Sequence, residues 1–102
     1  IRLPVVSPGC VHNAHLFRIM TADLAERTRL IAYLRERGIM ATFHYVPLHS
    51  APAGRKFGRF HGRDEFTTAE SDKLVRLPMY YGMAKEDRTA VVEAVSDFYR
   101  TR

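Results

Sequence analysis

Hydrophobic and polar residues alternate along residues 14–20, which predicts a β-strand with two different faces. Residues 41–46 form a second apolar segment, rich in residues that favour strands. Pro47 should end it, because proline cannot donate a ladder hydrogen bond and pushes the preceding residue into an extended conformation. A third apolar segment, residues 76–81, contains Pro78 and therefore reads as a short edge strand.

Three other segments are predicted to be helices, and in the first and third of them the apolar residues recur at helical spacing. The first runs from Asp23, a predicted N-cap with Glu26 as its partner, to the stop at Gly38. The second covers residues 68–75, behind a Thr67/Glu70 pattern typical of a capping box. The third covers residues 85–99, and one of its faces carries Val91, Val92, Val95, Phe98 and Tyr99.

The order strand, helix, strand, loop, helix, strand, helix predicts an α+β fold. We expect a two-layer sandwich in which the helices cover one face of a small, mainly antiparallel sheet. The uncovered face should be partly apolar and should pack on something outside this chain. A chain of 102 residues is long enough for one core, so residues 1–102 are predicted to form a single domain.

Composition narrows the class of protein. No apolar run approaches the ~18 residues needed to cross a bilayer. Cys10 is the only cysteine, which excludes an internal disulfide and a cysteine-based zinc site and favours a reducing, cytoplasmic setting. We interpret Cys10 as a small apolar filler or an incidental thiol. The chain starts with Ile1 and has no apolar leader region, which predicts a fragment or a processed product.

The positive charge is uneven. Sixteen Lys and Arg residues against eleven Asp and Glu residues give a net charge of +5. Part of the excess lies in one glycine-interrupted loop, where Phe57 and Phe60 alternate with Arg55, Lys56, Arg59, His61 and Arg63. Such a loop could bind a single-stranded nucleic acid by stacking and charge. The alternative, which we favour, is a solvated loop whose two phenylalanines anchor it to the core.

Residues 43–49 carry the candidate chemistry, because two imidazoles and a phenol follow one another at the end of a predicted strand. Within a regular strand His44 and Tyr45 point to opposite faces. A metal site is one interpretation, with His44 and His49 joined by His12, His15 or His61. No metal-binding motif accompanies these histidines. The plainer alternatives are structural histidines and a core tyrosine.

Five blocks in order resemble the C-terminal small domain of sugar-nucleotide aminotransferases. These enzymes form the DegT/DnrJ/EryC1/StrS family of fold-type I pyridoxal-phosphate (PLP) enzymes. The resemblance extends from about residue 8 to about residue 99. The blocks are His-Asn-Ala-His-Leu-Phe at 12–17, Arg-Gly-Ile at 37–39, His-Tyr-Val-Pro-Leu-His at 44–49, Thr-Thr-Ala-Glu-Ser at 67–71 and Arg-Leu-Pro-Met at 76–79.

This resemblance implies an enzyme that aminates a 4-keto-6-deoxy sugar nucleotide for lipopolysaccharide or other surface polysaccharide. It also implies PLP as cofactor, glutamate as amino donor and a homodimer, with neither nucleic acid nor membrane as a partner. The PLP-binding large domain would be absent from this chain. Lys56, Lys73 and Lys85 lack the sequence context of the family's Schiff-base lysine. We therefore expect no catalytic, cofactor-binding or metal-binding residue here, and no activity from the chain alone.

The resemblance also places His44, Tyr45 and His49 at a junction that reaches toward the nucleotide sugar. They are our candidate substrate-binding residues. Asn13 and His15 are weaker candidates, because asparagine and histidine at a strand entry commonly organise a turn. A stand-alone α+β module that binds a small ligand or a nucleic acid remains the alternative function.

Overall fold

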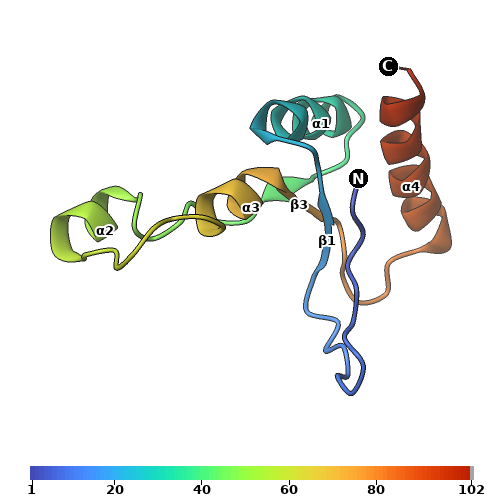
Figure 1. Ribbon diagram of the computed structural model, residues 1–102. Coiled ribbons are helices and arrows are strands. Elements are labelled where there is room, and N and C mark those ends of the chain that lie inside the picture. Colours follow the sequence, from blue (N-terminus) through green and yellow to red (C-terminus); the bar gives the residue numbers. More distant parts are fainter. Residues whose placement is uncertain (102) are drawn as a thin grey trace.

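The computed structural model describes residues 1–101, which contain three strands and four helices (Figure 1). It therefore has the predicted α+β class. None of its helices, within those residues, is long and apolar enough to cross a membrane. The elements in chain order are β1 (Phe17–Met20), α1 (Leu24–Glu36), β2 (Thr42–Phe43), α2 (Pro52–Phe57), α3 (Thr67–Lys73), β3 (Leu74–Leu77) and α4 (Lys85–Arg100).

β3 lies at the centre of the sheet, antiparallel to both β1 and β2. This arrangement confirms the predicted antiparallel sheet, but every strand is shorter than predicted. β1 starts later because Ala14 has a φ of +52°, which breaks the extended chain. β2 ends before Tyr45, whose φ is +30°. β3 begins two residues earlier than predicted and ends before Pro78, which has no N–H for the ladder.

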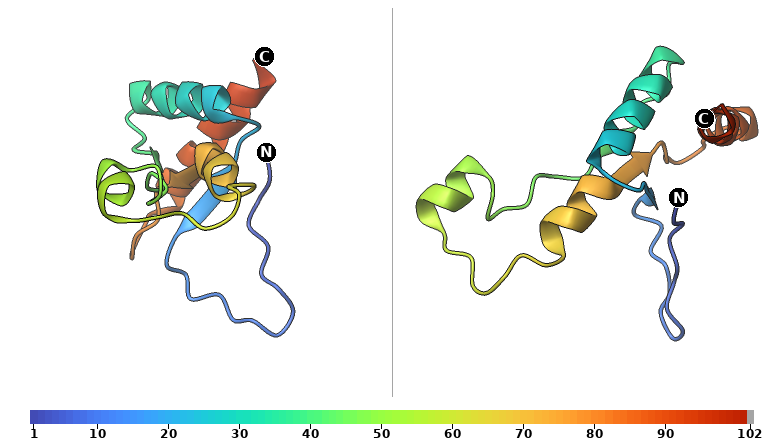
Figure 2. Two further views of the ribbon diagram at one scale, coloured as in Figure 1. Left: turned by 60° about the vertical axis from the view of Figure 1, so that its left-hand side comes forward. Right: turned by 45° about the horizontal axis from the view of Figure 1, so that its top comes forward.

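The core lies between the sheet and two helices. Ile19 of β1 and Val75 of β3 are cross-strand partners and face α1 and α4. The prediction that helices cover one face of the sheet is thus confirmed. Figures 1 and 2 show α2 and its flanking loops projecting away from this core. The buried apolar cluster consists of Ile19, Leu30, Leu34, Ala41, Val75, Ala94, Val95 and Phe98.

The start of α1 is as predicted. The Asp23 carboxylate accepts a hydrogen bond from the Glu26 N–H at 2.7 Å, and the buried Glu26 carboxylate accepts one from the Ala22 N–H at 2.8 Å. One unpaired N–H of the first helical turn, that of Glu26, and the N–H of Ala22 just before the cap are therefore satisfied. The pair also ties the end of β1 to α1.

The predicted capping box of α3 is wrong. Phe66, not Thr67, is the N-cap residue, and its side chain makes no capping hydrogen bond. Asp64 supplies the capping interaction, because its carboxylate accepts a hydrogen bond from the Thr68 N–H at 3.2 Å. Glu70 does not reach back to the helix start, because it forms an ion pair with Arg2 at 2.5 Å. A long-range charge pair outcompetes the local motif.

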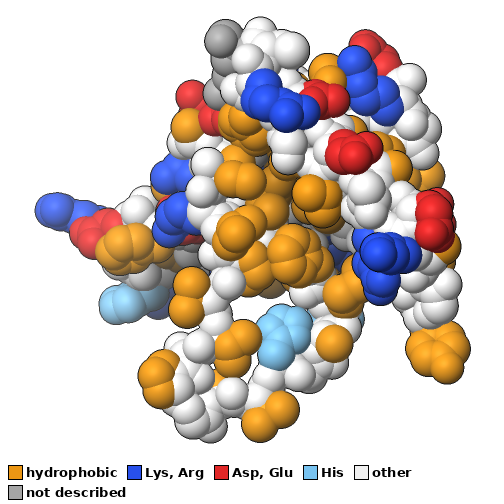
Figure 3. Space-filling view, turned by 90° about the vertical axis from the view of Figure 1, so that its right-hand side faces the viewer, with side chains coloured by type: hydrophobic (Ala, Val, Ile, Leu, Met, Phe, Trp, Pro, Cys, Tyr) orange, Lys and Arg blue, Asp and Glu red, His pale blue; other side chains and the backbone are white. Residues whose placement is uncertain are grey.

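The uncovered face of the sheet is partly apolar, as predicted, and it also carries polar side chains. Alternation from Ile19 and Val75 places Arg18, Thr42 and Arg76 on this side, together with Met20 and Leu74. The exposed apolar residues lie mainly on loops. Figure 3 shows hydrophobic side chains gathered at the centre of one face of the molecule, with charged groups around them. Cys10 is exposed, so it is not a core filler.

Candidate functional site

The chain leaves the sheet at the predicted junction, directly after β2. Tyr45 adopts a positive φ, which a non-glycine residue sustains only when its surroundings hold it. One such restraint comes from α3, where the Ser71 hydroxyl donates a hydrogen bond to the Tyr45 carbonyl at 2.9 Å. The exit from the sheet is thus held by a helix 26 residues further along the chain.

The next residues form a tight turn into α2. The Pro47 carbonyl accepts hydrogen bonds from the Ser50 N–H and the Ala51 N–H, both at 3.1 Å, and from the Ser50 hydroxyl at 3.0 Å. Gly54 is required behind this turn, because a Cβ there would lie 1.6 Å from the Leu48 carbonyl oxygen. The backbone around His49 is therefore locally constrained.

His49 lies in a hydrogen-bonded cluster with two residues that sequence analysis missed. Its Nε2 is 2.7 Å from Asp64 Oδ2 and 3.4 Å from Thr68 Oγ1, and the Thr68 hydroxyl in turn donates to Asp64. The Phe60 ring packs on the imidazole, with centroids 4.4 Å apart. The side chains of His49 and Asp64 are only 19% and 24% exposed. The sequence marks Asp64 only weakly, as an acidic residue that follows the basic loop and precedes a helix.

The cluster shifts the ionisation of Asp64. Hydrogen bonds from the Thr68 hydroxyl, and then from the Thr68 N–H, lower the pKa of the Asp64 carboxyl below its ordinary value. His49 lowers it further. The charged carboxylate is therefore the form that the folded protein favours, and it can orient the imidazole.

Asp64→Asn should reduce the acid sensitivity of the folded state. A carboxyl with a lowered folded pKa stabilises the protein above its unfolded pKa of about 3.9, and this contribution is lost as the pH falls through the lower folded value. We expect Asp64→Asn to lower the thermal midpoint at pH 7 and to flatten its decline between about pH 5 and about pH 2. Thermal unfolding followed across this pH series measures both effects.

Asp72→Asn is the matched control for this pH series. Asp72 lies on the same helix, and no side-chain partner is described for it in residues 1–101. Its variant should keep the wild-type profile. An Asp64→Asn profile parallel to that of the wild type would contradict the assignment.

His44 and Tyr45 lie beside each other in an edge-to-face arrangement, with ring centroids 4.8 Å apart. Tyr45 is 75% exposed, so the interpretation as a core tyrosine is wrong. His44 is half-buried, and within the described chain its Nδ1 is buried without a hydrogen-bond partner. A buried polar atom without a partner costs about 1–3 kcal/mol, which points to a role beyond packing.

Asn13 and His15 lie in a different part of the molecule. The Asn13 side-chain oxygen accepts a hydrogen bond from the His15 N–H at 3.2 Å, as expected for a residue that organises a turn. Both residues line a cavity of about 270 Å³ next to β1. His49 and Phe60 line another cavity of about 270 Å³, which shares no residue with the first. The structure therefore does not bring the five candidate residues into one cavity.

The basic loop is not anchored to the core by its two phenylalanines, as we had favoured. Part of it is α2, and neither phenylalanine belongs to the core. Phe57 is 80% exposed, while Phe60 is 44% exposed and contacts His49. The loop thus supports the histidine cluster rather than the core.

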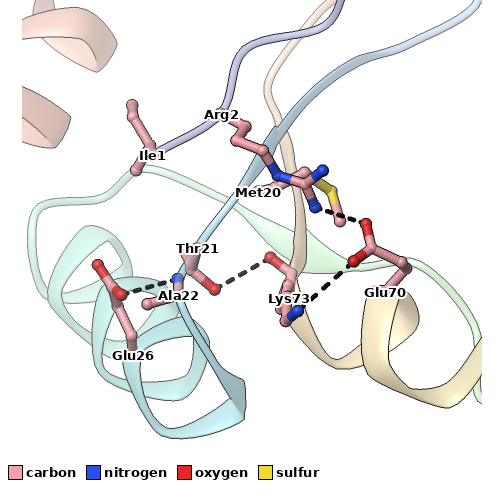
Figure 4. Close-up of a pocket in the computed structure, with 8 residues that line it drawn as sticks. All are labelled: Ile1, Arg2, Met20, Thr21, Ala22, Glu26, Glu70 and Lys73. Carbon is pink, nitrogen blue, oxygen red and sulfur yellow. Dashed lines mark hydrogen bonds and ion pairs between the residues drawn. The ribbon is translucent and has the colours of Figure 1, made fainter. Parts of the chain in front are cut away.

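A larger cavity of about 510 Å³ lies at the start of α1 and beside α3 (Figure 4). Its charged groups are paired with one another. Glu70 contacts Arg2 at 2.5 Å and Lys73 at 3.5 Å, and Arg2 is the main cause that lowers the pKa of the Glu70 carboxyl. The buried Glu26 caps α1. These contacts join the N-terminal segment to α3, and we assign the cavity no ligand.

A sequence profile of the DegT/DnrJ/EryC1/StrS aminotransferase family matches residues 3–96. The chain belongs to this family. Within it, the chain is 32% identical over 98 residues to a pleiotropic regulatory protein of Geobacillus stearothermophilus, covering 94% of this chain and 26% of that protein. It is also 32% identical over 98 residues to an uncharacterized protein of Methanocaldococcus jannaschii, covering 90% and 25%. This family member thus spans about a quarter of the length of these relatives.

Two solved structures that share this fold are named as aminotransferases. The aminotransferase TlmJ from Streptoalloteichus hindustanus superposes with a TM-score of 0.82 at 20% identity, over 96% of this chain and 25% of TlmJ. A putative sugar aminotransferase from Streptococcus pneumoniae, in its PMP form, superposes with a TM-score of 0.68 at 21% identity, over 85% and 22%. Both sequence identities are close to 20%, so this structural likeness establishes only the fold of the chain.

The three lysines of this family member lie outside the cavity beside His49. The Lys73 ammonium is 3.5 Å from Glu70, and the Lys56 ammonium lies over the Phe57 ring, 5.1 Å from its centroid. Lys85 is the first residue of α4. None of the three lines the cavity beside His49. None of the three lysines is therefore placed to hold PLP beside His49, and we derive no chemical step through the cofactor in this chain.

A metal site has no support in the same residues. No group of three or more histidine, cysteine, aspartate or glutamate side chains, within 1–101, is arranged to hold a metal ion. His49 is engaged by Asp64, and His12 accepts a hydrogen bond from the Ala14 N–H at 2.8 Å. The metal interpretation is therefore not carried further.

Proposed function

We propose that the protein carrying this chain is a PLP-dependent aminotransferase acting on a 4-keto-6-deoxy sugar nucleotide, and that this chain is its C-terminal small domain. Family membership over residues 3–96 carries the proposal. Within the family, the ordered set of five sequence blocks resembles most the transaminase that makes dTDP-4-amino-4,6-dideoxygalactose for lipopolysaccharide or other surface polysaccharide. The enzyme would work in the cytoplasm.

The cofactor would be held outside this chain, by a large domain. PLP, when bound, supplies the electron sink for transamination. The likeness in fold to an aminotransferase in its PMP form is consistent with this cofactor. We further propose glutamate as the amino donor and a homodimer as the functional assembly.

The role of this chain would be to position the substrate. We assign His44, Tyr45 and His49 to the nucleotide-sugar pocket, where they would donate hydrogen bonds to sugar hydroxyls or diphosphate oxygens. Three observations support this: the unpaired Nδ1 of His44, the exposed ring of Tyr45 and the Asp64 carboxylate that orients His49. Asn13 and His15 stay proposed as further contacts, from the separate cavity beside β1.

The test is an activity assay on the complete protein loaded with PLP. With glutamate and the dTDP-linked 4-keto-6-deoxy sugar, we expect the 4-amino sugar nucleotide and 2-oxoglutarate in equal amounts. A protein that binds single-stranded oligonucleotides in a salt-sensitive way, and turns over no keto sugar nucleotide, would instead support the binding-module alternative.

A further inference from the structure

Residues 50–63 form an arm that carries α2 and projects from the rest of the molecule (Figures 1 and 2). The radius of gyration of the chain is 15.8 Å, whereas a compact chain of this length has about 13 Å. Within residues 1–101, the hydrogen bonds of residues 51–63 stay between positions 47 and 65. No polar contact of these residues therefore ties the arm to the sheet, to α1 or to α4.

One polar cluster joins the two ends of the arm to each other and to α3. His49 lies just before the arm and Asp64 just after it, and His49 Nε2 is 2.7 Å from Asp64 Oδ2. Thr68 of α3 contacts both, because its hydroxyl donates to Asp64 and lies 3.4 Å from His49 Nε2. The Thr68 N–H adds a further hydrogen bond to Asp64 at 3.2 Å. The cluster thus fixes both ends of the arm against one helix.

The cavity of about 270 Å³ beside His49 has walls from both the turn and the arm. Leu48 lines it from the turn, whereas Arg59 and Phe60 line it from the arm. The Phe60 ring packs on the His49 ring, with centroids 4.4 Å apart. Residues 59–62 make no hydrogen bond within the described chain, so this stacking is the contact that holds their wall in place.

Charge strengthens the cluster. Hydrogen bonds from the Thr68 hydroxyl, and then from the Thr68 N–H, lower the pKa of the Asp64 carboxyl, so His49 faces a charged carboxylate. Hydrogen bonds to a charged group are roughly twice as strong as those between neutral groups. Arg59 is the other charged residue that lines the cavity, and within residues 1–101 no ion pair joins it to Asp64.

We propose that the arm is a lid and that the cluster of His49, Asp64 and Thr68 is its latch. Breaking the latch releases both ends of the arm together, because one carboxylate joins the turn to α3. The core stays folded, since the buried apolar cluster lies outside residues 44–66. Opening removes one wall of the cavity beside His49. The lid does not rest on the proposed aminotransferase, although in that enzyme it would lie beside a candidate substrate contact.

Digestion of the folded protein with trypsin tests the lid, because cleavage reports the population of the opened form. The arm exposes four trypsin sites, which are Arg55, Lys56, Arg59 and Arg63. In Asp64→Ala we expect cleavage at these sites to become about tenfold to a hundredfold faster, the range for losing a hydrogen bond to a charged group. Cleavage after Arg29, which is exposed on α1, should change by less than about twofold. Mass spectrometry of the first fragments assigns each site.

Glu65→Ala is the matched control. Glu65 is the next residue, it is exposed, and its side chain has no partner within residues 1–101. Its rate of arm cleavage should stay within about twofold of the wild type. An unchanged rate in Asp64→Ala, an equal rise in Glu65→Ala, or an equal rise at Arg29 would overturn the proposal.

Thr68→Val keeps the fold intact while it weakens the latch, because valine preserves the branched shape and removes only the hydroxyl. It should speed arm cleavage less than Asp64→Ala does. The double variant should match Asp64→Ala to within about twofold, because the hydroxyl then has no carboxylate left to bind. A wild-type rate in Thr68→Val, or additive effects in the double variant, would refute a shared latch. Normal turnover of the complete enzyme alongside such a result would refute the lid alone and leave the proposed aminotransferase intact.

Discussion

Leu34→Ala should lower the free energy of unfolding by about 2–5 kcal/mol, the range for a large aliphatic residue in a core. Leu34 is fully buried on α1, in the cluster that joins Ile19, Val75 and Phe98. Truncation leaves a cavity where the sheet meets both long helices, so the neighbours cannot easily close it. Urea denaturation followed by circular dichroism measures the change.

Leu24→Ala provides the control for this prediction. Leu24 begins the same helix but is 46% exposed, so its truncation should cost less than about 1 kcal/mol. Equal losses in the two variants would mean that the interface of α1 with the sheet is not the centre of stability.

His49→Ala should raise the KM for the nucleotide sugar about tenfold to a hundredfold in the complete enzyme, a range typical of losing a hydrogen bond to a charged group. This prediction rests on the proposed function. The imidazole is oriented by Asp64 at 2.7 Å and packed by Phe60, so its removal leaves no neighbouring donor in the same position. Because the bond-making chemistry would lie in another domain, kcat should change much less than KM.

His61→Ala separates this effect from a general change in the loop. His61 lies in the same basic loop and is exposed, so its variant should keep the wild-type KM. Steady-state kinetics at fixed glutamate concentration compare the two variants. A wild-type KM in His49→Ala would contradict the assignment, and so would an equal rise in His61→Ala.

The long helices were predictable because their signals are local. Apolar residues recur with the helical period from Leu24 to Leu34, and Asp23 supplies the cap within three residues of its partner. α4 likewise presents one apolar face, with Glu86 and Asp87 in its first turn. Such patterns need no knowledge of the rest of the chain.

The strand ends and the cap of α3 were not predictable in the same way. Tyr45 leaves the sheet with a positive φ while Ser71, far along the chain, holds its carbonyl. Glu70 pairs with Arg2 across 68 residues instead of capping its own helix. In each case a contact between distant segments overrides the local preference.

The candidate site could be predicted only in part, because it too depends on contacts between distant segments. The turn that presents His49 follows from Pro47 and the strand before it, but the partner Asp64 lies 15 residues away. No periodic pattern links them. The separation of Asn13 from this turn also depends on the path of the whole chain, which a motif cannot encode.

The most direct measurement is the distance between His49 Nε2 and a bound nucleotide sugar in a structure of the complete protein. If the turn after β2 positions the substrate, a sugar or diphosphate oxygen should lie within about 2.7–3.2 Å of this nitrogen, with Asp64 still in contact with His49. A nucleotide sugar bound at full occupancy, with no atom within about 5 Å of His44, Tyr45 or His49, would contradict the proposed role of this chain.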